Sequence, residues 1–223
     1  MPLKNVLLTF AVLAPIASGF NVAMAADIAS GLKLTDEYTL VGDKNFLADF
    51  QPKNRDGTIN VIVEIPTGSV AKWEVSKEDG SIKWEFKNGK PREVKFLGYP
   101  GNYGMIPRTL LSKEGGGDGD PLDVIVIGKA VPRGSVVKAH IIGVLKLLDG
   151  GEVDDKILAV SDSSAMSAAR SPSDLSSKFP GVLPIIETWF ESYKGSGEIE
   201  SNGFAGPEEA RKVIDAAISA YRS

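Results

Sequence analysis

The sequence predicts a mainly β fold of the α+β class, in which a closed antiparallel β-barrel carries α-helices on its outside. Strand-like segments follow one another at short spacing between residues 58 and 160, and no helical pattern separates them. Two segments with apolar residues at helical spacing follow after residue 180 and predict the outer helices. We expect a single domain over residues 26–223.

The predicted strands begin at residues 58–66, where Val and Ile dominate and Pro66 ends the run. Asn88-Gly89 predicts a hairpin turn, after which residues 92–97 would form the returning strand. The other strands are predicted at residues 71–77, 81–86, 121–128, 135–149 and 154–160. Residues 26–57 are mixed and polar, and we expect an arm or loop there.

The predicted helices cover residues 182–194 and 206–223. In the second, Pro207 suits the first turn and Glu208 and Glu209 suit the positive end of the helix dipole. One apolar stripe follows its face, made of Ala210, Val213, Ile214, Ala217 and Tyr221. The Ser-rich stretch between residues 161 and 179 is expected to be a loop with short helical turns.

Residues 1–25 have the pattern of a secretory signal peptide. Lys4 precedes an apolar stretch that is too short for a membrane span, and small residues end it at Ala25. A buried N-terminal helix is the structural alternative. We expect export, with the periplasm as the first interpretation and an organelle of a eukaryote as the alternative, and no membrane association after processing.

The composition narrows the classes of function. The net charge is −4, which argues against nucleic acid as a partner because phosphate backbones require a basic face. The chain has no cysteine and one histidine, so a metal site would use oxygen ligands.

Three aspartates, Asp118, Asp120 and Asp123, lie within six residues and lead directly into a predicted strand. A turn explains the first of them but not all three. A helix–loop–helix calcium site is excluded, because its sixth position is Asp123 and its twelfth is Lys129. A phosphate-binding loop is excluded because no Gly-Lys-Ser/Thr follows the glycines. The cluster therefore predicts a site for Mg²⁺ or Mn²⁺.

Charged residues also interrupt the predicted strands. Glu64 lies in an apolar strand, and Lys72 and Glu74 share one face of the next because they are two residues apart. A solvated strand face is the alternative explanation. Basic residues that could clamp a phosphate are Lys72, Arg92, Lys156 and Lys194. Together these features favour metal-assisted phosphoryl transfer to water.

Six segments then resemble, in order and spacing, the motifs of soluble family I inorganic pyrophosphatases. They are VIVEIP, KWEVSK, GYPGNYG, GDGDPLD, GVLKLLDGGEVDDK and WFESYK, and they span residues 58–194. The resemblance implies a five-stranded closed barrel of the OB type with flanking helices. It also implies hydrolysis of pyrophosphate to two phosphates by Mg²⁺-activated water, with Mn²⁺ as a substitute ion, in a homo-oligomer.

The resemblance assigns roles residue by residue. Asp120 would be the general base. The metal ligands would be Glu64, Asp118, Asp123, Asp149 and Asp154. The phosphate-binding residues would be Lys72, Arg92, Tyr103, Lys156, Tyr193 and Lys194, with Lys95 as the alternative to Arg92. The supporting residues would be Glu74 and Tyr99.

Two further expectations remain. His140 lies in an apolar strand, and we expect a structural histidine rather than a catalyst. The alternative function is a binding module, because OB-type barrels also bind single-stranded nucleic acid or oligosaccharide. The net negative charge and the carboxylate cluster disfavour that alternative.

Overall fold

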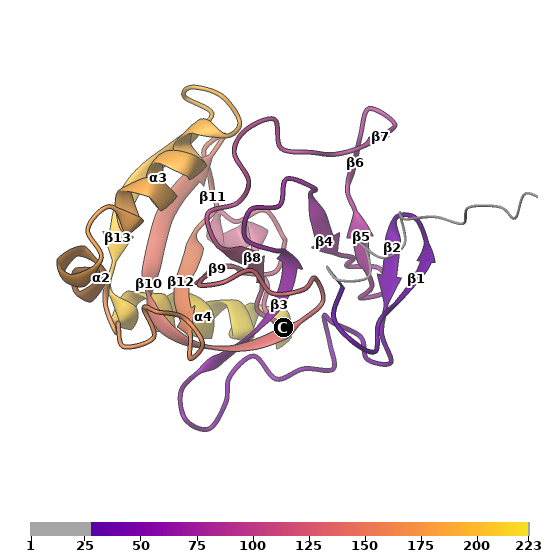
Figure 1. Ribbon diagram of the computed structural model, residues 1–223, viewed down its shortest axis with the longest axis horizontal. Coiled ribbons are helices and arrows are strands. Elements are labelled where there is room, and N and C mark those ends of the chain that lie inside the picture. The colour runs from indigo at the N-terminus through magenta and orange to yellow at the C-terminus, as the bar shows by residue number, and fades with distance from the viewer. Residues whose placement is uncertain (1–27, 223) are drawn as a thin grey trace, which may run out of the picture.

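The computed structural model describes residues 28–222, and the predicted signal peptide lies outside the described residues (Figure 1). The larger sheet contains β3 (Ile59–Ile65), β8 (Asn102–Met105), β9 (Asp123–Ile127), β10 (Val136–Asp149), β11 (Glu152–Val153), β12 (Lys156–Ser161) and β13 (Ile199–Ala205). The smaller sheet contains β1 (Lys33–Asp36), β2 (Thr39–Val41), β4 (Trp73–Val75) and β5 (Ile82–Trp84). A separate hairpin is formed by β6 (Phe86–Lys87) and β7 (Lys90–Pro91).

In the larger sheet the hydrogen-bonded neighbours follow the order β3-β8-β9-β12-β10 and then return to β3. This return depends on β10, which is 14 residues long. Its first residues pair with β3, where Val136 lies opposite Ile62, and its later residues pair with β12. A register shift between Ile141 and Gly143 marks an irregularity in the pairing with β12, of the kind that bends a strand.

Strands β9 and β12 run parallel, with Val124 opposite Ile157. The prediction of an antiparallel barrel was therefore wrong for this pair, although all other strand pairs among the described residues are antiparallel. Parallel neighbours need a crossover connection. Here β10, which lies between them in the sequence, supplies it.

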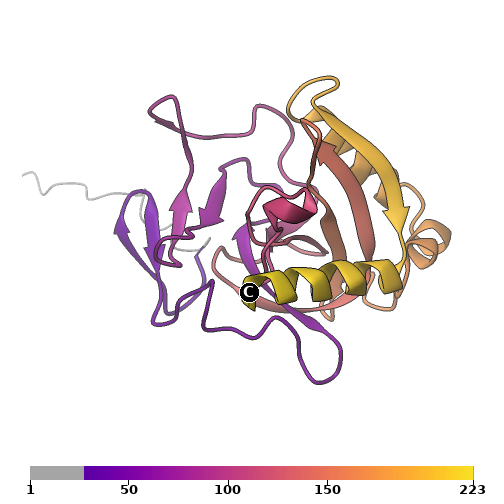
Figure 2. The same ribbon diagram turned by 180° about the vertical axis from the view of Figure 1, so that it is seen from behind.

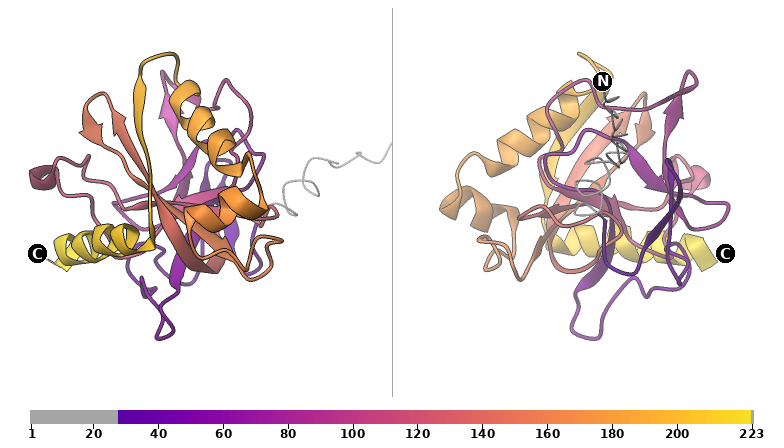
Figure 3. Two further views of the ribbon diagram at one scale, coloured as in Figure 1. Left: turned by 90° about the vertical axis from the view of Figure 1, so that its left-hand side faces the viewer. Right: turned by 45° about the vertical axis from the view of Figure 1, so that its right-hand side comes forward.

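Alternate residues of the strands face two apolar clusters. In β9, Ile125 and Ile127 pack with the helices α2 (Pro172–Lys178) and α3 (Val182–Ser192). Val124 and Val126 pack instead with the C-terminal helix α4 (Pro207–Arg222). Figure 2, seen from behind, shows α4 in front of the strands. Figure 3 shows α4 and the α2–α3 pair on different sides of β13.

The structure confirms the predicted strands at residues 58–66, 71–77, 121–128, 135–149 and 154–160, and both predicted helices. The segment 81–86 is divided between β5 and β6. The Asn88-Gly89 hairpin is also confirmed, since both residues have positive φ, as the tight two-residue turn requires.

Two expectations were wrong. Residues 92–97 contain no strand, because the hairpin ends at Pro91 and the chain then runs beside residues 70–72 with one isolated bridge from Glu93 to Ala71. Residues 26–57 are more than a loop: β1 and β2 pair with each other and with β5.

The prediction also missed β8, β11 and β13, whereas α2 lies in the Ser-rich stretch where short helical turns were expected. β8 reads Asn-Tyr-Gly-Met, and two of these residue types are uncommon in strands. Gly104 is required there because β8 passes close to β3. A Cβ at this position would lie 1.9 Å from the carbonyl oxygen of Ile62.

Candidate active site

A cavity of about 370 Å³ opens between the two sheets. Its lining comes from β3, β4, β8, the start of β9 and the loop before β9. Six of the residues predicted for the site line it, namely Glu64, Lys72, Glu74, Tyr103, Asp120 and Asp123. The smaller sheet therefore contributes Lys72 and Glu74, and the larger sheet contributes the acids opposite them.

The parallel pairing of β9 and β12 places Lys156 beside Asp123 at the start of both strands. The side chain of Lys156 is 4% exposed, and its Nζ donates to Asp123 Oδ2 at 2.6 Å and also to Asp154 Oδ1. Burial would lower the pKa of Lys156, but the carboxylates of Asp123 and Asp154 outweigh it and raise the pKa. Burial raises the pKa of Asp154. Lys156 therefore places one positive charge between the two acids.

Glu64 is buried in β3 with 4% exposure. Its Oε1 accepts a hydrogen bond from the amide of Val75 in β4 at 2.6 Å, so the acid links the two sheets. Burial raises the pKa of Glu64 to about 8, against the attraction of Lys72. The carboxyl group therefore carries a proton near neutral pH when no other cation is near it.

An aromatic cluster begins at Tyr103 in the cavity lining and extends from there to α3. The ring of Tyr103 lies 5.0 Å from that of Tyr99, which lies 4.4 Å from Trp189 in α3, and Trp189 stacks on Tyr193 at 4.7 Å. Lys72 Nζ lies 5.2 Å from the centre of the Tyr103 ring. Burial raises the pKa of all three tyrosines, so each remains a neutral hydroxyl donor.

The acidic loop is held in shape by its own backbone. Asp118 Oδ1 accepts from the amide of Asp120 at 2.8 Å, and Gly119 between them has φ of +84°, a conformation that favours glycine. The amide of Leu111 donates to the carbonyl of Asp120 at 2.7 Å. The side chain of Asp120 is half exposed and forms an ion pair with Lys77.

Three predicted residues lie at the edge of the site. Lys194 forms an ion pair with Asp149 and lies 5.7 Å from the centre of the Tyr193 ring. The guanidinium of Arg92 donates to both carboxylate oxygens of Glu85, at 2.7 and 2.8 Å. None of these three residues lines the cavity as it stands.

Lys77 and Glu85 contact predicted site residues, and the sequence interpretation missed both. Lys77 is the last residue of the segment KWEVSK, and the residue two positions before it, Val75, is apolar. The local sequence therefore gave no sign of a charged partner for Lys77. Its partner, Asp120, lies 43 residues further along the chain. A contact over this separation follows from the fold and leaves no local pattern.

A scan against family models supplies the deciding comparison: the model for inorganic pyrophosphatase matches residues 61–222. The chain belongs to the inorganic pyrophosphatase family. Soluble inorganic pyrophosphatase 2 of Chlamydomonas reinhardtii is 34% identical over 181 residues, which are 78% of this chain and 86% of that protein. The inorganic pyrophosphatase of Helicobacter pylori strain J99 is 34% identical over 171 residues, which are 73% of this chain and 90% of that protein.

Solved structures agree with the family assignment. A type I inorganic pyrophosphatase from Toxoplasma gondii matches with a TM-score of 0.79 and 26% identity, over 86% of this chain and 97% of that one. One from Helicobacter pylori matches with a TM-score of 0.65 and 33% identity, over 78% and 99%. The chain spans about half the length of two other relatives, 55% of the yeast mitochondrial enzyme and 52% of the Drosophila melanogaster enzyme.

Members of this family are generally metal-dependent, and the donor set suits a hard cation. Asp118, Asp123 and Asp154 offer carboxylate oxygens, and the chain has no cysteine. Among residues 28–222, no three acidic or histidine side chains are arranged as they stand to hold an ion. The lysine contacts explain this: Lys156 joins Asp123 and Asp154, and other lysines contact Asp120 and Asp149.

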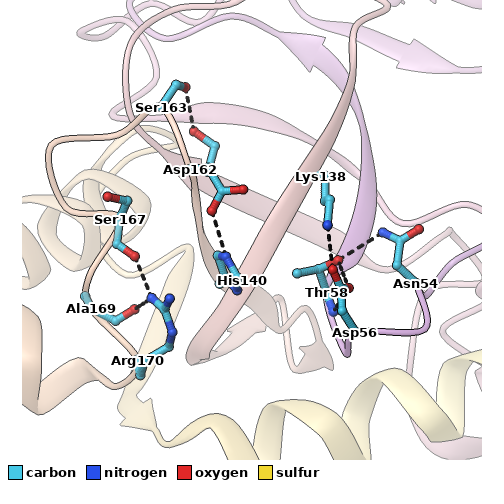
Figure 4. A network of polar contacts seen from close by, with 11 residues as sticks. Asn54, Asp56, Thr58, Lys138, His140, Asp162, Ser163, Ser167, Ala169 and Arg170 are labelled. Atoms are coloured by element: carbon cyan, nitrogen blue, oxygen red, sulfur yellow. Dashed lines mark hydrogen bonds and ion pairs between the residues drawn. The ribbon is translucent and has the colours of Figure 1, made fainter.

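His140 does not line the cavity. Its Nε2 lies 2.8 Å from Asp162 Oδ1 on an outer strand surface, in the network of polar contacts that Figure 4 shows. This position fits the structural role expected for it. Within the described part of the chain, no helix is long and apolar enough to cross a membrane.

Proposed function

We propose that this chain hydrolyses inorganic pyrophosphate to two orthophosphates. The observation that carries the proposal is the cavity, where the acids Glu64, Asp120 and Asp123 face Lys72 and Tyr103. In the reaction, water adds to one phosphorus and the bridging P–O bond breaks. The bridging oxygen leaves with the second phosphate, so that one water and one pyrophosphate give two phosphates.

The proposed magnesium ligands are carboxylates of the larger sheet and its loops: Asp118, Asp123 and Asp154, with Asp149 and Glu64 for further ions. Bound Mg²⁺, or Mn²⁺ in its place, supplies positive charge to the substrate and lowers the pKa of a bound water. The lysines that now contact these acids can then turn to phosphate oxygens, since each carries a flexible four-carbon stem.

Asp120 is the proposed general base that takes the proton of the attacking water. Its carboxylate is half exposed at the cavity and its backbone is fixed by Leu111, so the group is accessible while the loop is held. The ion pair with Lys77 is between two exposed side chains, and such a pair contributes little stability. Lys77 is therefore easily displaced from the base.

The proposed phosphate-binding residues are Lys72, Arg92, Tyr103, Lys156, Tyr193 and Lys194. The ammonium and guanidinium groups stabilise the charge of the leaving phosphate, and the neutral tyrosine hydroxyls donate hydrogen bonds. Glu74, which lines the cavity, and Tyr99, whose ring contacts that of Tyr103, are proposed to support this set. Pyrophosphate is highly anionic, so it binds where cations gather and acids are neutralised.

Three further proposals concern the barrel, the oligomeric state and the location of the protein. We propose that the cycle β3-β8-β9-β12-β10 is the five-stranded closed OB-type barrel, within one domain of residues 26–223. We propose a homo-oligomer, because the resemblance implies one. Export to the periplasm rests on the pattern of residues 1–25 alone, and an organelle of a eukaryote remains the alternative. Fractionation of expressing cells, with sequencing of the mature N-terminus, tests this.

The full chain, incubated with pyrophosphate, tests the activity. Phosphate release should depend on Mg²⁺ and stop with excess EDTA. Single-stranded nucleic acid and an oligosaccharide serve as ligands for the alternative function. Binding of either without phosphate release from pyrophosphate would refute the proposal in favour of a binding module.

A further inference from the structure

Arg133 lies behind the cavity and does not line it. It belongs to the connection between β9 and β10 and is 8% exposed. Its Nε donates to the main-chain carbonyl of Glu64 at 2.8 Å. Its guanidinium lies over the ring of Trp73, with Cζ 4.4 Å from the ring centre. A buried guanidinium is costly unless it is well partnered, so these contacts fix the side chain in one position.

The Trp73 ring continues toward the phosphate-binding residues. It stacks on Trp84 with the ring centres 5.3 Å apart. Trp84 Nε1 donates to the carbonyl of Arg92 at 2.9 Å, and the amide of Lys72 donates to the same oxygen at 3.0 Å. Arg133 is therefore joined, through two stacked rings and one shared carbonyl, to the main chain of both cations.

On its other side, the segment that carries Arg133 is tied to β3. The amide of Gly134 donates to the carbonyl of Val63 at 2.7 Å, and the amide of Val63 donates to the carbonyl of Ser135 at 2.9 Å. Glu64 follows directly, and its carboxyl accepts from Val75 in β4. Arg133 thus contacts β3 at Glu64 and β4 at Trp73, although it does not itself line the cavity.

We propose that Arg133 is a positioning residue that sets Lys72 and Arg92 at the correct distance from Glu64. This inference rests on the proposed function, since Lys72 and Arg92 bind phosphate in it. Arginine suits the role because one planar group can stack on an indole while its Nε bonds a carbonyl. Loss of the group should shift β4 against β3, which misplaces substrate contacts while the acids of β9 and β12 remain in place.

The test compares Arg133→Met and Arg133→Lys with the unmodified full chain. In Arg133→Met we expect KM for pyrophosphate to rise by about tenfold while kcat stays within about threefold, as for lost ground-state binding. Arg133→Lys should give an intermediate KM, because an ammonium retains attraction to the ring but lacks the planar fork.

Arg108 offers a matched control. It is half-buried, its Nε also donates to a main-chain carbonyl, that of Ala48 at 2.6 Å, and it does not line the cavity. Arg108→Met should lower Tm without changing KM. A KM for Arg133→Met within about twofold of the unmodified chain, or an equal rise in Arg108→Met, would overturn the proposal.

Two further measurements test the role of Arg133 if Arg133→Met does not fold or if the unmodified chain releases no phosphate. If Arg133→Met does not fold, Trp73→Phe weakens the same stack and should raise KM, and an unchanged KM there would count against the role. If the unmodified chain releases no phosphate, the proposed function fails. Arg133 is then judged by calorimetric binding of imidodiphosphate, which should be weaker in Arg133→Lys than in the unmodified chain, and equal affinity would refute positioning.

Discussion

Replacement of Lys156 by Met should strongly destabilise the metal-free protein. The ammonium is 4% exposed, while its partners Asp123 and Asp154 have side chains 20% and 13% exposed. Methionine fills a similar volume but leaves two partly buried carboxylates without this cation. Removal of one partner of a buried ion pair costs about 3–5 kcal/mol. For a chain of this length, that loss corresponds to a fall in Tm of roughly 6–20 °C.

Thermal unfolding followed by circular dichroism in EDTA measures this loss. Lys53→Met is the matched control, because Lys53 pairs with Asp215 on the surface, where the partner side chains are 35% and 62% exposed, and such pairs contribute about 0–1 kcal/mol. Added Mg²⁺ should raise the Tm of Lys156→Met more than that of the unmodified chain. A Tm for Lys156→Met within about 2 °C of the unmodified chain in EDTA would refute the reasoning.

Three other predictions concern the base, the core and pH. Asp120→Ala should fold and bind Mg²⁺ but lose most pyrophosphate hydrolysis, and near-normal phosphate release would exclude this base. Ile214→Ala should cost about 2–5 kcal/mol in chemical denaturation, because Ile214 is fully buried between α4 and the strands, and an unchanged midpoint would contradict that packing. Hydrogen bonds from Lys138 and Thr58 hold the pKa of Asp56 well below its usual range (Figure 4). The stability that Asp56 contributes is therefore present above about pH 4 and is lost as the pH falls further. Asp56→Asn should then flatten the acid side of a plot of Tm against pH. An unchanged acid side would argue against the Lys138–Asp56 ion pair.

Two lysines of the site form ion pairs with the proposed metal ligands. Lys156 forms ion pairs with Asp123 and Asp154, and Lys194 forms one with Asp149. The same lysines are the proposed phosphate ligands. These contacts limit the repulsion among the acids, and under the proposed function metal and substrate would replace them.

The sequence by itself determined the local elements and the chemistry of the site. The alternation in residues 71–77 placed Trp73 and Val75 in the core and Lys72 and Glu74 together on the opposite face, and the structure has both pairs so. The Asn88-Gly89 turn and the helix over residues 207–222 were likewise predictable, because period and turn chemistry depend on neighbours in the chain. The order of the acidic and basic motifs sufficed for the family.

The tertiary structure alone decided which distant residues meet. The parallel pairing of β9 with β12 joins Lys156 to Asp123 across 33 residues, and a hydrogen bond behind the cavity joins Arg133 to Glu64 across 69. Short strands such as β8 and β11 also form only because neighbouring strands offer them partners. Periodicity records which face a side chain takes, whereas strand order depends on the burial of whole faces against one another, and no single segment encodes that.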